Sequence, residues 1–430
     1  MGGKVSLFLV MGFAGIFALF SKNIMDTSTR TVDNYAFYFS KSQAHHIAVS
    51  GIHLAMMEIN INDPKWTAGY SNKPMAGGYL DLSVANSAVS GVIRVTSIGK
   101  YGSISDTVVV TAKQRSYAEY GNYYNVFSNV WAATGDTFDG KFHANDWIQC
   151  YGDPVFKGVV TTSKGVKLYD KKSHPKFEDG WKMQTNDPVK FDTAAMRIDA
   201  YAGGKVFRDT TNKGKITNVK LNFNSDGTVK YSLSIDGKPY TPEITMPVTD
   251  LAPNGLIYIE RGNALIQGTL NGQVTIVASK RGTNGAGRVL IDNTIQYAVD
   301  PLEQPDLCDD YLGIVAEQQV EIPFNPARGD FTIHASMLMQ NGGLVVTNYW
   351  SYPKAYKMNI VGGIIGHKVE ATATYVWDPI KKQYVPKKGY SYIHKYDKRF
   401  DITVPPYFPK MRIFSTIAWY EGEVFIPVFD

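Results

Sequence analysis

The sequence predicts an α+β fold, with a long N-terminal α-helix followed by a β-rich region. Three observations support this fold class. An almost wholly apolar run continues into a segment with helical periodicity, residues 63–115 carry short alternating strands, and residues 251–372 carry many closely spaced strands. We therefore expect a helix, a small antiparallel sheet and a parallel β-helix, in that order along the chain.

The long helix is predicted over residues 1–62. Its first part, residues 5–20, reads VSLFLVMGFAGIFALF and is apolar except for one serine. Residues 21–62 are amphipathic, because their apolar residues recur at steps of three and four, and they contain no proline. Asp63-Pro64 ends the helix, because the residue before a proline disfavours the helical conformation. A helix of this length would extend for ~87 Å.

The apolar run at residues 5–20 has three interpretations: a cleaved signal peptide, a transmembrane anchor, or the start of a helix that leaves the membrane and packs in a filament core. The run is shorter than the ~20 residues of a bilayer span, and no small-residue cleavage site follows it. Its unbroken continuation into residues 21–62 favours the third interpretation. The expected core of this assembly helix is Val5, Leu7, Phe8, Leu9, Val10, Met11, Phe13, Ile16, Phe17, Leu19 and Phe20.

Two glycines, Gly12 and Gly15, lie about one turn apart inside the apolar run. Glycines at this spacing allow close approach of a second helix or a partly unwound, flexible segment. The alternative is that they are ordinary glycines tolerated in a lipid-facing helix.

Residues 1–62 resemble the N-terminal helix of type IV pilin-like proteins, and among them the PilX-like group. The resemblance rests on a short basic leader, an apolar stretch and an amphipathic second half, SKSQAHHIAVSGIHLAMMEI. It implies membrane insertion before assembly and cleavage after a glycine, for which Gly3 is the candidate. Pilins usually carry a glutamate five residues into the mature chain, and Phe8 has that place here. Strand-rich strings after residue 251, such as GTLNGQVTIVAS and LGIVAE, resemble a pilin-like bacterial surface family of unassigned function.

The β-rich region divides into four predicted parts. Residues 63–115 form a small β-sheet domain, residues 116–250 a mixed β region, residues 251–372 a β-helix, and residues 373–430 a C-terminal β-rich cap. A β-sandwich is the alternative for residues 251–372. Several intervals between strands there are shorter than the usual 8–12 residues, and this favours stacked coils.

Composition narrows the function classes. The net charge of +5 is small for 430 residues and no basic run occurs, so nucleic-acid binding is not expected. The two cysteines, Cys150 and Cys308, lack the spacing of zinc or thioredoxin-like motifs. They form either one disulfide between distant parts of the chain or two separate buried thiols.

Catalytic motifs are absent from the sequence: it has no H-E-x-x-H, G-x-S-x-G or Walker loop. Two polar groups contain residue types that can bind a metal or act as acid and base, but we interpret them as turn and loop residues. They are His143, Asn145 and Asp146 with His174, and the acidic group Asp306, Asp309 and Asp310. We therefore expect no catalytic residue, metal site or cofactor. A polysaccharide-active β-helix enzyme stays open as an alternative, since such sites cluster carboxylates on one face of a coil.

The resulting prediction is a structural subunit of an extracellular or cell-surface filament. Its partner would be itself, as a helical homopolymer, after insertion into the inner membrane. The main alternative is a membrane-anchored surface adhesin that binds through exposed aromatic side chains. The candidates for that role are Trp377, Tyr384, Tyr390, Tyr392 and Tyr396.

Overall fold

The computed structural model describes residues 2–89, 91–127, 130–184, 186–211, 213–380 and 383–421, with side chains from Ser6 onward. The chain forms two compact units. The helix–sheet unit comprises Met1–Arg115 and Arg412–Asp430, and the stacked-strand unit comprises Ser116–Met411. In sequence, the second unit is thus an insertion into the first.

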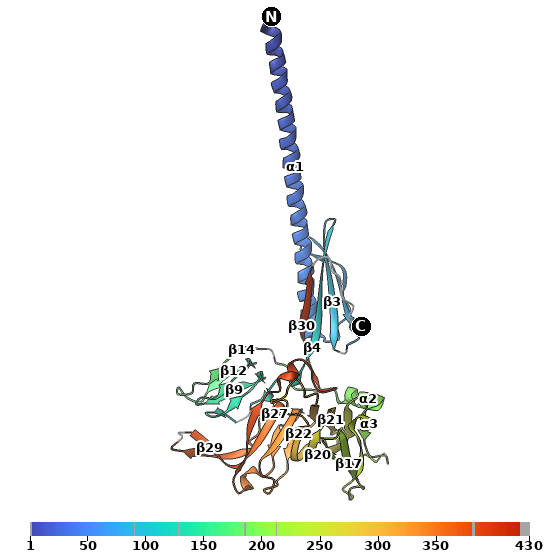
Figure 1. The fold of residues 1–430 in the computed structure, drawn as a ribbon, viewed down its shortest axis with the longest axis vertical. Helices are drawn as coiled ribbons and strands as arrows, with labels where there is room; N and C mark the ends of the chain where they lie inside the picture. The colour runs from blue at the N-terminus through green and yellow to red at the C-terminus, as the bar shows by residue number, and fades with distance from the viewer. Residues whose placement is uncertain are drawn as a thin grey trace. The chain divides into compact units, whose positions relative to one another are not determined.

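The predicted long N-terminal helix is confirmed. Helix α1 spans Gly2–Met57 without interruption and is continued by one π-helical turn, η1, at Glu58–Asn62. Asp63 closes the helix by donating its backbone N–H to the carbonyl of Glu58 at 2.9 Å. Figure 1 shows α1 as one rod with β3 and β30 beside its C-terminal end.

A five-stranded sheet packs on the end of α1, in the order β1-β2-β3-β4-β30. Neighbours from β1 to β4 are antiparallel. The last strand comes from the region predicted as a C-terminal cap, so that boundary is corrected. Asn60 binds this strand, since its side-chain amide donates to the carbonyl of Phe414 and accepts from the Phe414 N–H. The strands are β1 Tyr70–Met75, β2 Gly78–Asn86, β3 Val92–Tyr101, β4 Ile104–Ser116 and β30 Lys410–Glu421.

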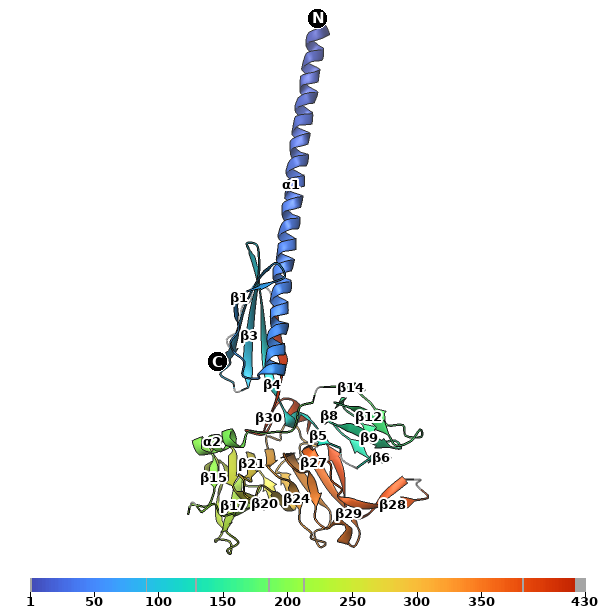
Figure 2. The same cartoon turned by 180° about the vertical axis from the view of Figure 1, so that it is seen from behind.

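The core of the helix–sheet unit is a narrow stripe of α1 buried against β2 and β3. Figure 2 shows β3 beside the C-terminal end of α1. Two glycines allow the close approach. A Cβ at Gly99 of β3 would lie 2.0 Å from the carbonyl oxygen of Ala44, and one at Gly51 of α1 would lie 2.2 Å from Ser97 Oγ. The helix therefore lies almost directly on the backbone of the sheet. The buried stripe consists of Ala44, Ile47, Ala48, Ile52, Ala55 and Ile59.

The stacked-strand unit consists mainly of short strands that pair in parallel, coil on coil. One ladder contains β15 Lys205–Phe207, β19 Leu256–Glu260, β21 Gln273–Ser279, β23 Tyr311–Ala316, β25 Phe331–Met339 and β27 Ala355–Lys368. A second contains β16 Thr217–Phe223, β20 Gly262–Leu270, β22 Val289–Tyr297, β24 Val320–Ile322 and β26 Leu344–Val346. Inward positions stack by register: Ile257, Ile276, Ile314, Met337 and Ile364 are all buried in one core.

The parallel stacking begins earlier in the chain than predicted, within the region described as mixed. Three sets of very short strands form successive coils there. They are β5 Asn122–Val126, β8 Phe142–Ala144, β11 Val160–Thr162 and β14 Trp181–Met183; β6 Ala132–Ala133, β9 Trp147–Tyr151 and β12 Gly165–Leu168; and β7 Thr137–Phe138, β10 Val155–Phe156 and β13 Lys176–Phe177. Strands of two or three residues are too short to show a hydrophobic period, so the pattern did not reveal them.

The early coils and the coils of the two ladders join into a single stack of strands. The end of β27 pairs in parallel with β5, so Ile364 lies opposite Asn122. Figure 2 shows β27 beside β5, although more than 200 residues separate them in sequence. The connection runs from the last early coil through helix α2, Thr193–Gly203, to β15 at the other end of the ladder.

Antiparallel strands and short helices complete this unit. The hairpin with Asp226-Gly227 in its turn is present between β16 and β17, and a second hairpin joins β28 to β29. The remaining elements are β17 Thr228–Ile235, β18 Ile244–Pro247, β28 Ala373–Asp378, β29 Gln383–Lys395, α3 Val248–Leu251, η2 Tyr117–Glu119, η3 Tyr349–Ser351 and η4 Lys398–Asp401.

Candidate assembly helix

The first half of α1 is exposed on every side. All side chains from Ser6 to Phe39 are exposed, with Phe8 at 74% and Phe17 at 69%. We call Ser6–Phe39 the bare half, and the segment from Ala44 to Ile59, buried against the sheet, the packed half. Val5 belongs to the predicted assembly core, but its side chain lies outside the described part. The other predicted core residues are all in the bare half: Leu7, Phe8, Leu9, Val10, Met11, Phe13, Ile16, Phe17, Leu19 and Phe20.

The bare half combines great length with a strongly apolar first part. Among the described residues, the helix from Ser6 to Asn62 meets the length and composition of a membrane-crossing helix. Its most apolar window has a mean hydropathy of 1.8 and is not buried. Monomeric soluble proteins rarely expose apolar patches this large, so such a surface marks a membrane or a protein interface.

Gly12 and Gly15 lie in regular helix, so α1 is not unwound at either position. Apart from the helix's own backbone nearby, a Cβ built on either glycine meets no atom of the described residues within 4 Å. The space beside them is therefore open, in contrast to that beside Gly51 and Gly99. Gly3, the candidate processing site, lies in the first turn of α1.

A polar belt, residues 21–34, follows the apolar run. Two of its hydroxyls are satisfied within the helix: Thr29 Oγ1 donates to the carbonyl of Met25 at 2.9 Å, and Thr31 Oγ1 donates to that of Thr27 at 2.8 Å. The charged side chains of the belt behave differently. Within the described residues, none of them makes an ion pair or a side-chain hydrogen bond: Lys22, Asp26, Arg30 and Asp33.

The candidate disulfide is not formed. Cys150 and Cys308 are both free, buried thiols in the core of the stacked-strand unit. Cys150 lies on β9 in the early coils, whereas Cys308 lies in the loop before β23. Burial raises the pKa of the Cys150 thiol to about 12, which keeps it protonated and unreactive.

His143 and Asn145 belong to a buried hydrogen-bond network. His143 Nδ1 lies 2.7 Å from Thr161 Oγ1, and its Nε2 lies 2.9 Å from Asn145 Oδ1. Asn145 in turn donates to the carbonyl of Asp187 at 2.8 Å. Both ring nitrogens therefore have protein partners, and the network fastens the segment before α2 to the early coils. Asp146 instead forms an ion pair with Lys164 at 2.7 Å.

The acidic group before β23 contains one buried carboxylate. Asp310 accepts hydrogen bonds from the backbone N–H groups of Gly272 at 2.6 Å and Ala298 at 3.0 Å, although burial raises its pKa. Arg399 spans this loop, since it pairs with Asp397 at 2.7 Å and donates to the carbonyls of Cys308 and Asp310. Asp310 therefore has a structural role.

The predicted C-terminal aromatics divide into two groups. Tyr390 and Tyr396 are buried and Tyr392 packs against the core, whereas Trp377 and Tyr384 are exposed. The exposed pair continues into three aromatics of the early coils that the sequence analysis did not single out. We call the resulting set the aromatic row. Its ring centroids follow one another at 5.4, 6.2, 4.8 and 5.2 Å along Trp377, Tyr384, Tyr151, Tyr169 and Trp131.

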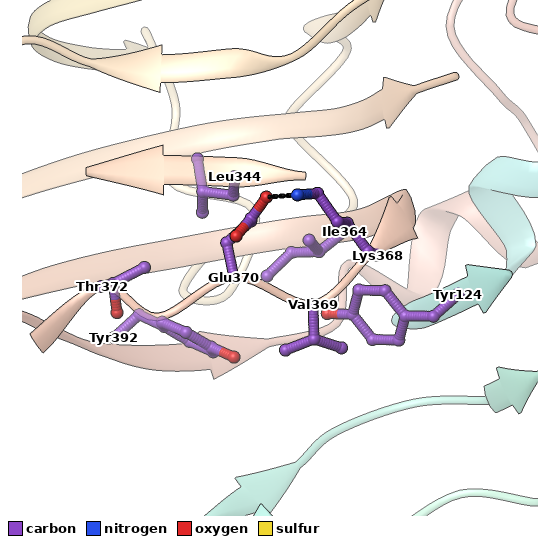
Figure 3. A pocket seen from close by; sticks show the side chains of 8 residues that line it. All are labelled: Tyr124, Leu344, Ile364, Lys368, Val369, Glu370, Thr372 and Tyr392. Atoms are coloured by element: carbon purple, nitrogen blue, oxygen red, sulfur yellow. Dashed lines mark ion pairs between the residues drawn. The ribbon is translucent and has the colours of Figure 1, made fainter. Parts of the chain in front are cut away.

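A small pocket lies where β5, β27 and β29 meet (Figure 3). It has room for about one water molecule. Tyr124, Val369 and Tyr392 line it, and an ion pair of 2.7 Å joins Lys368 to Glu370 at its edge. Over the part of the chain that the structure describes, no three His, Cys, Asp or Glu side chains are grouped to hold a metal ion.

No protein-family model matches the chain, and no curated protein matches it. Among solved structures, the chain is similar to the competence-associated pilin ComZ from Thermus thermophilus, at 10% sequence identity and a TM-score of 0.37. The alignment covers 89% of this chain and 97% of that chain. The resemblance to the PilX-like group stays a prediction, and the function proposed below rests on this chain's own residues.

Proposed function

We propose that this protein is a pilin-like structural subunit of a cell-surface filament, assembled through the bare half of α1. The observation that carries the proposal is that every side chain in that half is exposed, apolar residues included, whereas its own sheet covers the second half. The same segment would hold the subunit in the inner membrane before assembly. The stacked-strand unit would then face the outside of the filament.

Assembly has a sufficient driving force. Transfer of a large apolar side chain out of water stabilises by about 1.5–3 kcal/mol, and the bare half offers many of these. In the membrane, lipid covers the apolar run. In a filament, the bare halves of neighbouring copies cover one another, and the polar belt then lies between helices.

The test compares Asp substitutions in two parts of α1. Leu9→Asp or Phe13→Asp places a charge in the apolar run, and we expect filaments sheared from cells to disappear from negative-stain micrographs. Thr27→Asp is the matched control, because it adds the same charge within the polar belt. The stacked-strand unit should keep its protease resistance in all three variants.

Normal filament yield from Leu9→Asp and Phe13→Asp would overturn the proposal. Cell-bound monomer from the parental chain, without filaments, would favour a membrane anchor instead.

A second candidate function is a membrane-anchored surface adhesin, and the aromatic row favours it. Neighbouring rings of the row are tilted or perpendicular to one another, so single rings could each stack against a sugar ring. Tyr and Trp supply large contact areas with a polar handle. The measurement is binding of the full chain to a panel of polysaccharides. Trp377→Ala should weaken binding at least tenfold, whereas Trp350→Ala, at an exposed site outside the row, should not.

The proposed role does not include catalysis. The engaged nitrogens of His143, the structural role of Asp310 and the small pocket of Figure 3 support this part of the proposal. Incubation with acidic polysaccharides should release no reducing sugar ends. Their release by the purified chain would revive the enzyme alternative.

A further inference from the structure

We infer that the four charges of the polar belt set the axial register between neighbouring copies of α1, with an offset of about one helical turn. The inference rests on the proposed function and names its partner surface: the same helix face of a second copy. Four observations carry it: where the charges lie on the helix, their lack of partners, the glycines on the same face, and the order of their signs.

The four charges share one side of the helix. At about 100° per residue, Lys22, Asp26, Arg30 and Asp33 fall within a sector about 80° wide. They are the only charged side chains between Lys4 and Lys41. They therefore form one charged stripe on a helix that is otherwise uncharged for its whole bare half.

Among the residues that the structure describes, the stripe has no counterpart in its own chain. All four side chains are exposed, and none is paired within the described residues. The neighbouring hydroxyls of Thr29 and Thr31 are satisfied inside the helix. A neighbouring copy packed on this face must therefore place opposite charges beside these four, because a desolvated unpaired charge is strongly unfavourable.

The face that carries the stripe is also the one that admits a close neighbour. Gly12 and Gly15 fall in the same sector, with open space beside them. The sector continues into the packed half through Ala44, Ala48 and Gly51, where the sheet lies against it. The chain's own sheet covers this face in one half and leaves it bare in the other.

The order of signs selects the offset. Neighbouring copies run parallel, since each must place its apolar end in the same environment. With no offset, every charge faces its own kind. With an offset of three or four residues, ~5–6 Å, Lys22 faces Asp26, Asp26 faces Arg30, and Arg30 faces Asp33 of the second copy. With an offset of seven or eight residues the facing charges are again alike, because Lys22 meets Arg30 and Asp26 meets Asp33.

Charge reversal tests the pairing in the full chain. Asp26→Lys makes two of the three facing pairs like-charged, and we expect at least a tenfold fall in filament yield. The fourfold variant Lys22→Asp, Asp26→Lys, Arg30→Asp and Asp33→Lys restores all three pairs, so its yield should return to the parental value. Parental yield from Asp26→Lys, or a fourfold variant as defective as Asp26→Lys, would overturn the inference.

Disulfide cross-linking between neighbouring copies measures the offset directly. Leu19→Cys and Asn23→Cys lie four residues apart, near the stripe. Filaments mixed from the two variants should give more disulfide-linked dimer on oxidation than filaments of either alone. Dimer that forms equally in the single-variant filaments would mean no offset, and the register inference would fail while the assembly proposal stood. Filaments from Leu9→Asp would instead remove the assembly proposal itself.

Discussion

The two halves of α1 have comparable apolar content and opposite surroundings. In the packed half, small residues such as Ala44, Ala48 and Gly51 alternate with isoleucines, and the sheet lies directly on them. In the bare half, large side chains such as Phe8, Phe13 and Phe17 point in all directions. A helix that serves one sheet needs one apolar stripe, whereas a helix surrounded by lipid or by other helices can be apolar all round.

The same difference between the two halves appears in the space beside their glycines. A methyl group has no room at Gly51 or Gly99, where the helix and sheet of the chain meet. At Gly12 and Gly15 it would meet no described atom within 4 Å beyond the helix's own backbone. The open space beside Gly12 and Gly15 is compatible with the proposed packing of a second copy on this face.

The largest expected difference between the two halves of α1 comes from adding a methyl group to a glycine beside the packed half and to a glycine in the bare half. In Gly99→Ala, the added Cβ would lie 2.0 Å from the Ala44 carbonyl oxygen and 2.6 Å from the Ala48 nitrogen. Both are backbone atoms, so the helix must move off the sheet, and we expect a loss of ~3 kcal/mol or more in the free energy of unfolding. Thermal unfolding of the detergent-solubilised full chain measures it.

Gly12→Ala is the matched control for that substitution. Beyond the helix's own backbone, no atom of the described residues lies within 4 Å of its Cβ. Alanine also favours the helix by about 1 kcal/mol over glycine, so the dispersed chain should not lose stability. A destabilisation by Gly12→Ala as large as that by Gly99→Ala would contradict the division of α1 into two halves.

Truncation of a large side chain in each half sharpens the comparison with a smaller effect. Ile47 is fully buried in the helix–sheet core, so Ile47→Ala should lower the free energy of unfolding by about 2–4 kcal/mol. Phe17→Ala should leave the stability of the dispersed chain unchanged, because Phe17 is 69% exposed. The same urea titration measures both, and equal losses would mean that the bare half is covered within the chain.

Sequence patterns predicted the elements with a clear period. The apolar steps of α1, the proline after Asp63 and several strands, such as residues 256–260 and 273–279, were visible because each is long enough to repeat its pattern. The early coils were not, because strands such as Val155–Phe156 are too short to alternate. Their parallel partners lie a whole coil away in sequence, where a local pattern cannot show them.

The residues of the candidate assembly helix could be predicted from their apolar composition, but their exposure could not. The apolar run predicted which residues take part in assembly, but only the structure shows which part of the helix the sheet covers. The aromatic row shows the opposite case. Tyr384 was a candidate from sequence, whereas its neighbour Tyr151 comes from a different coil, and only the stacking places their rings 6.2 Å apart.

The smallest expected effect is on the pH dependence of stability, to which a buried histidine should contribute and an exposed one should not. His394 is buried in the stacked-strand unit, where its Nε2 donates to the carbonyl of Gly362 at 2.9 Å and its Nδ1 lies 3.2 Å from the side-chain amide of Asn122. Burial lowers the pKa of His394 below its ordinary value of 6.5. The folded chain therefore binds fewer protons than the unfolded chain as the pH falls through that value. The resulting stability is full above about pH 6.5 and is lost progressively below it.

We expect the melting temperature of the stacked-strand unit to fall between pH 7.5 and pH 5. His394→Gln, which keeps a donor and an acceptor without titrating, should reduce this fall. His334 should supply part of the remainder, because burial lowers its pKa too and its Nδ1 accepts the Tyr297 N–H at 3.3 Å. His46→Gln is the control, because His46 is exposed on α1. An unchanged pH dependence in His394→Gln would mean that His394 is not the buried neutral histidine that its two hydrogen-bond partners require.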